Sequence, residues 1–553
     1  MATIKFNKKE FEKYIKLTDE VKEKISMFGT HFESLSEDGN DVVLEIMPNR
    51  PDLYSLQGFV KSFLAFLGKS KEKGLRGYKL NKPEKNYQVT IDSSVKEIRP
   101  YTACAIVKGM KFDDEKIKEI IDIQEKIHTT LGRNRKKIAI GIYPLEKITL
   151  PIKLEARAPK DIKFIPLEID REMTGLQILQ SHPTGREYAH LLEGKDKFPI
   201  FVDAKGDILS MPPIINSHKT GKITESTSEI FIECSGFDFE ILKKTINILV
   251  TMLSDIGGEV YQMELIYGKE KVFTPDLTPE KMKLSIENTN KLLGLELKEN
   301  EIKSLLEKMG YNFDIKSKIA EIPAWRTDIM HEVDLIEDIA IAYGYDKFKP
   351  EIPQISTIGE ISKIENLKKT ISEILCGLNT LEISTYHLIT KESARQFNLK
   401  EADSIEVADS KSEYKILRPN LISCMLNTLK NNVDSEYPQR LFELGVSFQK
   451  DSKGKTESGI IETEKLCISI ASPNSGFTEI KQTLEYLMRM LGKHKEISLQ
   501  SAENENIIVG RCAAILHNSK QIGYLGEIRP QLLSNLSIKM PVAALEIDIE
   551  SLL

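Results

Sequence analysis

Four carboxylates between residues 328 and 338 have a spacing that could hold a divalent cation. Asp334, Glu337 and Asp338 are three or four residues apart and so lie one turn apart on a helix, with Asp328 just before or at its first turn. Like charges at this spacing are mutually unfavourable by about 0.2–0.5 kcal/mol per pair. A set of oxygen ligands suits Mg²⁺. The acids therefore predict either a magnesium site or a solvated acidic face that is partly paired with Lys or Arg elsewhere.

The helix that must position these acids is predicted by the apolar residues of the same segment. The expected core-facing residues step by four, three, four and three positions: Ile329, Val333, Ile336, Ala340 and Tyr343. Gly344 is placed to end the helix, and Pro323 prevents an earlier start.

A second group of polar residues lies near the middle of the chain. Ser210 belongs to a segment, 209–217, that follows an Asp-Gly turn, and Glu233 and Ser235 point to one side of an alternating strand, 231–235. No Ser-His-Asp order or Cys-His pairing is evident, so none of these residues is assigned as a nucleophile. His190 is an alternative base, although a lone histidine beside two leucines is more often structural.

The chain divides into four predicted units, 1–86, 87–273, 274–350 and 351–553. The first combines a strand, 41–47, with a helix, 56–67, and the second alternates strands such as 138–142 with a helix, 239–253. The third has two short helices around Gly294 that resemble a helix-turn-helix, but no basic residues line the second. The fourth opens with a helix, 364–378, and closes with a strand, 543–549. The fold class is α+β and multidomain.

One loop of the second unit, residues 132–137, carries four cations directly before a strand. It predicts either a surface turn or a phosphate-binding patch.

Composition limits the possible functions. The 553 residues are 41% hydrophobic and 29% charged, which is typical of a soluble protein with several cores. A net charge of −6 provides no global field for nucleic acid, so any such contact must be local or made by a partner, and no DNA binding is expected. The six scattered cysteines indicate free thiols in a reducing cytoplasm. No apolar run approaches the 18 residues of a membrane span, and the charged start contains no signal peptide.

Two segments resemble one known family. The run Trp325 to Tyr345 resembles the signature of the beta subunit of phenylalanine-tRNA ligase, archaeal and eukaryotic type, and MPNRPDLYSLQGF, residues 47–59, resembles its amino-terminal element. The resemblance implies a B3/B4-type α/β editing domain, a helix-turn-helix-like B5 domain and a class II synthetase-like antiparallel-sheet module without a working active site. It also implies that Asp328, Asp334, Glu337 and Asp338 hold Mg²⁺ next to an alpha subunit.

The same resemblance places Ser210, Glu233 and Ser235 in an editing pocket that removes tyrosine wrongly attached to tRNA(Phe). Family members commonly have Ser, Asp and Thr at these three positions. Glu233 and Ser235 keep the carboxylate and the hydroxyl, but each side chain differs from the common one by one carbon. A site that hydrogen-bonds the tyrosine hydroxyl disfavours phenylalanine, because phenylalanine would leave its polar groups unpaired. A strand-end carboxylate bonded to backbone amides and a core serine are the structural alternative.

The resemblance further implies an alpha-two beta-two heterotetramer that binds tRNA(Phe). The fourth unit lacks a glycine-rich strand ending in an arginine, so the adenylating site is expected on the alpha subunit. Two alternatives remain. One is a tRNA-binding scaffold without hydrolysis, and the other is a magnesium-dependent hydrolase that uses Asp334, Glu337 and Asp338 directly.

Overall fold

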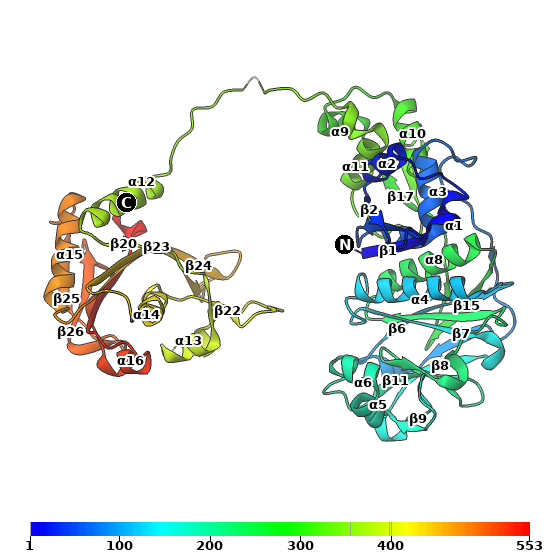
Figure 1. Cartoon of the computed structure of the whole chain (residues 1–553), viewed down its shortest axis with the longest axis horizontal. Helices are drawn as coiled ribbons and strands as arrows, with labels where there is room; N and C mark the ends of the chain where they lie inside the picture. The colour runs from blue at the N-terminus through cyan, green and yellow to red at the C-terminus, as the bar shows by residue number, and fades with distance from the viewer. Residues whose placement is uncertain (1, 354, 398, 400) are drawn as a thin grey trace. The chain divides into compact units, whose positions relative to one another are not determined.

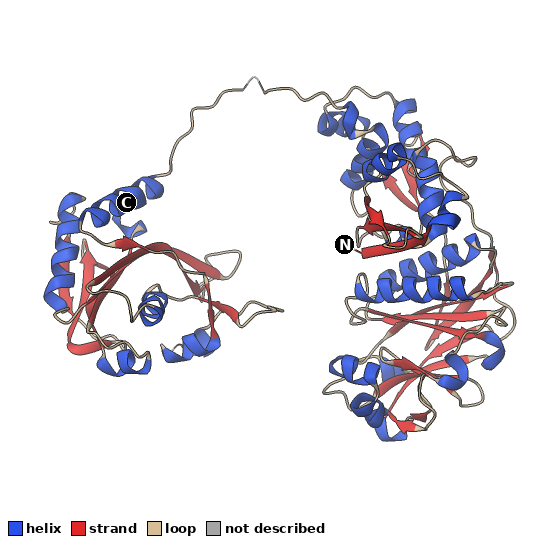
Figure 2. Ribbon diagram, viewed as in Figure 1, coloured by secondary structure: helices blue, strands red, loops and turns tan. Residues whose placement is uncertain are grey.

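The computed structural model describes residues 2–353, 355–397, 399 and 401–553, and the chain forms two compact units, residues 1–351 and 352–553 (Figures 1 and 2). The three predicted amino-terminal units lie together in the first. Their buried side chains form one continuous apolar cluster, which includes Phe59, Ile127, Leu249, Leu306 and Ile336. The three segments therefore share a core.

The amino-terminal segment is a small antiparallel sheet in the order β1-β3-β2, covered by helices. Its elements are β1 (Ala2–Asn7), α1 (Lys8–Glu12), α2 (Asp19–Met27), β2 (His31–Leu35), β3 (Asp41–Ile46) and α3 (Leu56–Phe66). The predicted strand and helix are confirmed. Phe59, Val60 and Phe63 are buried on the inner face of α3, and Phe59 and Phe63 pack against Phe28.

An eleven-stranded sheet dominates the middle of the first unit, with nine strands in the order β13-β12-β11-β8-β5-β15-β6-β14-β7 and β4 and β16 paired with β15. The strands are β4 (Leu80–Asn81), β5 (Gln88–Ile91), β6 (Tyr101–Lys108), β7 (Ile138–Pro144), β8 (Ile152–Arg157), β11 (Phe198–Val202), β12 (Ile208–Met211), β13 (Ile215–Asn216), β14 (Ile230–Gly236), β15 (Glu259–Tyr267) and β16 (Glu270–Thr274). Helices α4 (Asp114–Thr129) and α8 (Phe239–Asp255) lie side by side over the β6, β14 and β7 part (Figure 1). Helices α5 (Gly175–Ser181), α6 (Pro183–Tyr188) and α7 (His218–Gly221) and the short strands β9 (Lys163–Phe164) and β10 (Met173–Thr174) complete this region.

The remaining part of the first unit is a three-stranded antiparallel sheet, β17-β19-β18, with three helices. Its elements are β17 (Glu280–Lys283), α9 (Ile286–Leu293), α10 (Glu299–Lys308), β18 (Asn312–Asp314), β19 (Ile319–Ile322) and α11 (Glu332–Tyr343). Gly294 ends α9 with φ +65°, a left-handed conformation that favours glycine. The two predicted helices on either side of Gly294 are therefore present.

The second unit contains a seven-stranded sheet in the order β20-β23-β24-β28-β27-β26-β25, antiparallel except where β20 joins β23. The strands are β20 (Leu381–Glu382), β23 (Gln439–Lys450), β24 (Ile460–Ala471), β25 (Ile497–Ser501), β26 (Ile507–His517), β27 (Lys520–Ile528) and β28 (Val542–Asp548). Helices α12 (Lys363–Gly377) and α15 (Phe477–Met490) pack on one face, and α14 (Ile422–Asn431) and α16 (Pro530–Asn535) contribute to a separate apolar cluster. Helix α13 (Lys391–Gln396) adjoins a hairpin of β21 (Leu388–Thr390) and β22 (Tyr414–Leu417).

All six cysteines are free, and five are buried. None of the helices among the described residues combines the length and the apolarity that crossing a bilayer requires.

Candidate functional sites

A cavity of about 530 Å³ lies beside strands β7, β12, β13 and β14 and helix α4. Its walls are largely apolar, with Ile120, Ile140, Ile142, Pro212 and Ile214 among them. Ser210, Asn216 and Glu233 also line it and meet around one buried tyrosine hydroxyl. An apolar cavity with a few convergent polar groups is the usual form of a small-molecule site.

Tyr143 links these polar groups. Its hydroxyl donates to Ser210 Oγ at 2.8 Å and lies 3.3 Å from both Asn216 Oδ1 and Glu233 Oε1. Its ring is fully buried and stacks on Phe231 with 5.7 Å between the centroids.

Gly141 makes the contact between Tyr143 and Glu233 possible. It lies opposite Glu233 in the β14–β7 ladder. A Cβ at position 141 would lie 2.2 Å from the Tyr143 hydroxyl and 2.6 Å from Glu233 Oε1, so any larger residue would push the two groups apart.

Glu233 is the most perturbed carboxyl of the site. Burial raises its pKa to about 8, although the nearby Arg99 charge acts in the opposite direction. Its Oε2 atom is buried and has no hydrogen-bond partner among the described residues. At neutral pH this group is therefore mostly a carboxylic acid, and one of its oxygens is free to bind a ligand.

Ser235 has a different position from the one predicted. It lies two residues from Glu233 on β14, but it does not line the cavity. Its Oγ accepts a hydrogen bond from Arg99 Nε at 3.1 Å, and its carbonyl accepts one from the same guanidinium at 2.5 Å. The structural alternative, a core serine, describes Ser235 better than a pocket residue does.

Of the histidines of this region, His128 and His218 line the cavity, and His128 does not have the geometry of a free base. His128 lines the cavity, where its Nε2 accepts the Ile140 backbone N–H at 2.8 Å and its Nδ1 lies 3.1 Å from Glu125 Oε1. Burial lowers the pKa of His128, so the neutral ring donates from Nδ1 to Glu125 and both nitrogens are occupied. His190 is exposed and lies outside the cavity lining.

The raised pKa of Glu233 predicts a pH-dependent effect of Glu233→Gln. Between pH 4.5, the ordinary value, and about pH 8, the unfolded chain loses this proton while the folded chain keeps it. The contribution of Glu233 to the free energy of unfolding therefore falls as pH rises through this window. We expect Glu233→Gln to gain stability relative to the unaltered chain between pH 5 and pH 8, measured as the shift in denaturation midpoint. Glu225→Gln, at an exposed position, is the control, and a difference that is the same at both pH values would contradict the assignment.

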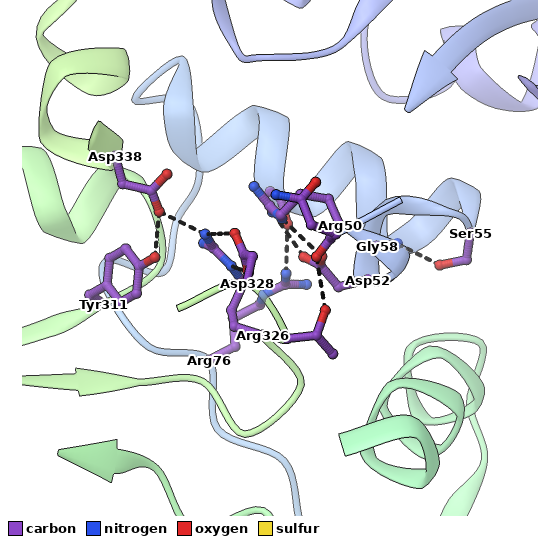
Figure 3. Close-up of polar contacts among 12 residues, drawn as sticks. Arg50, Asp52, Ser55, Gly58, Arg76, Tyr311, Arg326, Asp328 and Asp338 are labelled. Atoms are coloured by element: carbon purple, nitrogen blue, oxygen red, sulfur yellow. Dashed lines mark hydrogen bonds and ion pairs between the residues drawn. The ribbon is translucent and has the colours of Figure 1, made fainter. Parts of the chain in front are cut away.

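The acidic cluster is organised around an arginine (Figure 3). Arg326 is 2% exposed and binds Asp328 through two hydrogen bonds of 2.7 Å. The same guanidinium lies 2.8 Å from Asp338 Oδ2, which also accepts a hydrogen bond from the Tyr311 hydroxyl. Two of the four predicted metal ligands are thus neutralised by the chain itself.

The other two acids have separate environments. Asp334 accepts the backbone N–H groups of Met330 and His331 at 2.8 and 2.7 Å and so caps α11, whereas Glu337 is exposed. Within the described part of the chain, no three His, Cys, Asp or Glu side chains form a group that could hold a metal ion. As placed in the structure, Asp328, Asp334, Glu337 and Asp338 do not converge on one point. Successive helical residues diverge by about 100°, which separates Glu337 from the buried Asp338.

These residues do not fit a magnesium ion as they are placed. An ion bound by all four acids would have to displace Arg326 and the cap of α11. Magnesium binding remains a prediction, whereas the alternative of pairing with an arginine is found for Asp328 and Asp338.

The apolar stripe of α11 also differs from its prediction. Ile336 and Ala340 are buried as expected, but Val333 is 48% exposed. Leu335, Ile339 and Ala342, which do not belong to the expected stripe, are buried as well. Gly344 follows the helix with φ +101°, as expected of its terminating residue.

The two family-like motifs meet in space. Thr327 Oγ1 donates to the Asn49 carbonyl at 2.8 Å across 278 positions of sequence. Beside this contact, Arg50 binds Asp52 through two hydrogen bonds of 2.9 Å (Figure 3). Trp325 is 6% exposed and contacts Tyr78 edge to face, so it packs in the core of the first unit.

Buried charged residues of the second unit pair with other residues of the same unit. Arg418 is 1% exposed and donates to Glu443 Oε1 at 2.7 Å. Glu546 accepts the backbone N–H groups of Leu421 and Ile422 and pairs with Lys465 at 2.8 Å. A cavity of about 580 Å³ beside Glu546 has no arginine among its described lining residues.

Comparisons with known proteins agree with this architecture. Residues 87–252 match the family profile described as B3/4 domain, residues 282–345 match the tRNA synthetase B5 domain, and residues 349–549 match the phenylalanyl tRNA synthetase beta chain CLM domain. These matches define the chain as a polypeptide of an aminoacyl-tRNA synthetase.

Its relatives specify which one. Phenylalanine–tRNA ligase beta subunits of Pyrococcus horikoshii and Archaeoglobus fulgidus are 39% and 37% identical, over 91% and 96% of this chain and 90% and 95% of their own lengths. The crystal structure of an amino-terminal fragment of the phenylalanyl-tRNA synthetase beta subunit from Pyrococcus horikoshii is 38% identical, with a TM-score of 0.59, and covers 62% of this chain and 99% of that fragment. The chain belongs to the phenylalanine–tRNA ligase beta subunit family.

Proposed function

We propose that this chain works with an alpha subunit in a cytoplasmic alpha-two beta-two ligase and hydrolyses tyrosine wrongly esterified to tRNA(Phe). The observation that carries the proposal is the unpartnered Oε2 of Glu233 in an otherwise mainly apolar cavity of about 530 Å³. The apolar walls suit an aromatic ring, and the free oxygen together with Ser210 and Asn216 suits its phenolic hydroxyl.

Selectivity follows from the cost of unpaired groups. Tyrosine would supply the missing partner of Glu233, whereas phenylalanine would leave that group buried and unsatisfied. Sites built to hydrogen-bond a substrate hydroxyl discriminate strongly against the analogue that lacks it. The part of the cavity that contains Ser210, Asn216 and Glu233 therefore selects the tyrosyl group over the phenylalanyl group.

The hydrolytic step needs no residue as a nucleophile. A water oxygen bonds to the ester carbon, the bond from that carbon to the ribose oxygen breaks, and the products are tyrosine and tRNA with a free ribose hydroxyl. His128, which lines the cavity, has both ring nitrogens engaged, and we assign Ser210, Asn216 and Glu233 to binding and orientation.

Adenylate formation belongs to the alpha subunit in this proposal. The buried Arg418 is bound to Glu443, and Glu546 occupies the backbone N–H groups at the start of α14. The described lining of the adjoining cavity contains no arginine that could hold ATP phosphates. Purification of this chain from its native host should recover a second, synthetase-like polypeptide in equal amount, and recovery of the chain alone would contradict the assembly.

A scaffold without hydrolysis is the second candidate. The shared apolar core of the first unit would support a purely architectural role. Incubation of the assembled ligase with Tyr-tRNA(Phe) distinguishes the candidates, since only the proofreading subunit releases tyrosine.

A further inference from the structure

The basic turn that joins α4 to β7, residues 132–137, has an unusual backbone. Arg133, Asn134 and Arg135 all have positive φ, at +47°, +53° and +63°. Three successive non-glycine residues in this region are strained, and such strain persists only where the surroundings hold it in place.

The surroundings do hold it. The Gly132 N–H donates to the Ile127 carbonyl and the Lys137 N–H donates to the Gly132 carbonyl, both at 2.8 Å. A Cβ at Gly132 would lie 2.6 Å from the His128 carbonyl, so the turn passes close against the end of α4.

Arg135 anchors the turn to the cavity wall. Its guanidinium donates to the Ile214 carbonyl and to Glu125 Oε1, both at 2.9 Å, and lies 4.5 Å from the centroid of the Tyr188 ring. Its Nε is buried and has no partner among the described residues. Arg135 is therefore held against the cavity wall by these contacts.

The remaining cations of the turn face solvent. Arg133, Lys136 and Lys137 are exposed, and none of them forms an ion pair with another described residue. Lys222 and His218, also exposed, line the same cavity from α7 and the residue that follows it.

The turn itself is strongly positive, and one of its cations, Arg135, lines the cavity. Glu125 and Glu168 are the acids of the cavity lining outside its buried polar end, and Glu125 is already bound to Arg135. This local charge contrasts with the chain's net charge of −6. A concentration of unpaired cations next in the chain to a residue that lines a cavity, as beside Arg135, favours a polyanion.

We propose that the turn 132–137 binds the phosphates of the last nucleotides of the tRNA 3′ strand whose aminoacyl group enters the cavity. The inference deepens the proposed proofreading function and rests on it. An ester held in the cavity places its ribose at the mouth, and the phosphates of the strand then lie against the anchored turn. Contacts of this kind position the strand without reading its bases.

The test compares a substrate with phosphates and one without them. The assembled ligase carries Arg133→Gln, Lys136→Gln and Lys137→Gln together, and its hydrolysis of Tyr-tRNA(Phe) and of 3′-O-tyrosyl-adenosine is measured. We expect KM for Tyr-tRNA(Phe) to rise about tenfold or more, with kcat within about twofold and the hydrolysis of tyrosyl-adenosine unchanged. The slope of log KM against log salt should fall by about 2, since each lost contact to a single strand removes about 0.7.

The matched control removes three exposed lysines elsewhere in the first unit, by Lys85→Gln, Lys205→Gln and Lys269→Gln, and should leave KM unchanged. An unchanged KM for Tyr-tRNA(Phe) in the turn variant, or an equal loss on both substrates, would overturn the proposal.

A second readout does not depend on hydrolysis. Uncharged tRNA(Phe) should protect Lys136 and Lys137 of the unaltered ligase from acetylation but leave Lys205 reactive, and equal reactivity with and without tRNA would overturn the proposed contact. If the unaltered ligase hydrolysed neither ester, the proofreading function would fail, whereas this protection would still decide whether the turn contacts tRNA.

Discussion

Replacing Arg326 with leucine should lower the free energy of unfolding of the first unit by about 3–5 kcal/mol, because it leaves a buried ion pair without its cation. Asp338 is 5% exposed, and Asp328 depends on Arg326 for its two hydrogen bonds of 2.7 Å. The Arg326 charge also holds the pKa of Asp328 below its ordinary value against the effect of burial. Denaturation can be followed by fluorescence, because Trp325 is the only tryptophan and adjoins the site.

Two further variants make the Arg326 prediction specific. Arg157→Leu removes a partly exposed ion pair with Glu155 in the same unit and should cost less than about 1 kcal/mol. Adding Asp338→Asn to Arg326→Leu should recover part of the loss, since it removes the uncompensated charge. A loss below about 1 kcal/mol for Arg326→Leu would show that the acidic cluster has another source of neutralisation.

Replacing Glu233 with alanine should lower kcat/KM for the deacylation of Tyr-tRNA(Phe) by about 100-fold. Loss of one buried hydrogen-bond partner costs about 1–3 kcal/mol, and a factor of ten corresponds to about 1.4 kcal/mol. Glu233→Gln retains a donor and an acceptor at this position and should lose less. The measurement is the initial rate of tyrosine release by the assembled ligase.

Two serines provide matched controls for this prediction. Ser210 lines the cavity and receives the Tyr143 hydrogen bond at 2.8 Å, whereas Ser235 is bound to Arg99 and does not line it. Ser210→Ala should therefore reduce the rate more than Ser235→Ala. The reverse order would contradict the assignment of the cavity as the tyrosyl site.

Local patterns in the sequence predict the secondary structure well. Period and terminal signals place α3, α8 and α12 within about two residues of the structure at each end. They fail to specify which face of α11 is buried, because this helix packs against α9 and α10 and buries Leu335 and Ile339, whereas Val333 faces solvent. The spacing of apolar residues along a helix does not show how many other helices pack against it.

The candidate sites depend on contacts between distant segments, and local sequence patterns do not specify such contacts. Ser210 and Glu233 were predicted and both line the cavity, yet Tyr143, which joins them, lies one residue beyond the predicted strand 138–142 and carries no polar pattern. Asn216 lies within the segment 209–217 but had no assigned role. Arg326 lies inside the signature run, and only the geometry shows that it pairs with both Asp328 and Asp338.

The most direct test of the account compares two esters on the assembled ligase. Tyr-tRNA(Phe) and Phe-tRNA(Phe) are incubated with it at neutral pH without ATP or free amino acid, and deacylation is followed over time. The account predicts that the tyrosyl ester is hydrolysed at least about 100-fold faster than the phenylalanyl ester, because only tyrosine satisfies the buried polar end of the cavity. Equal rates for the two esters, or hydrolysis of neither, would contradict it.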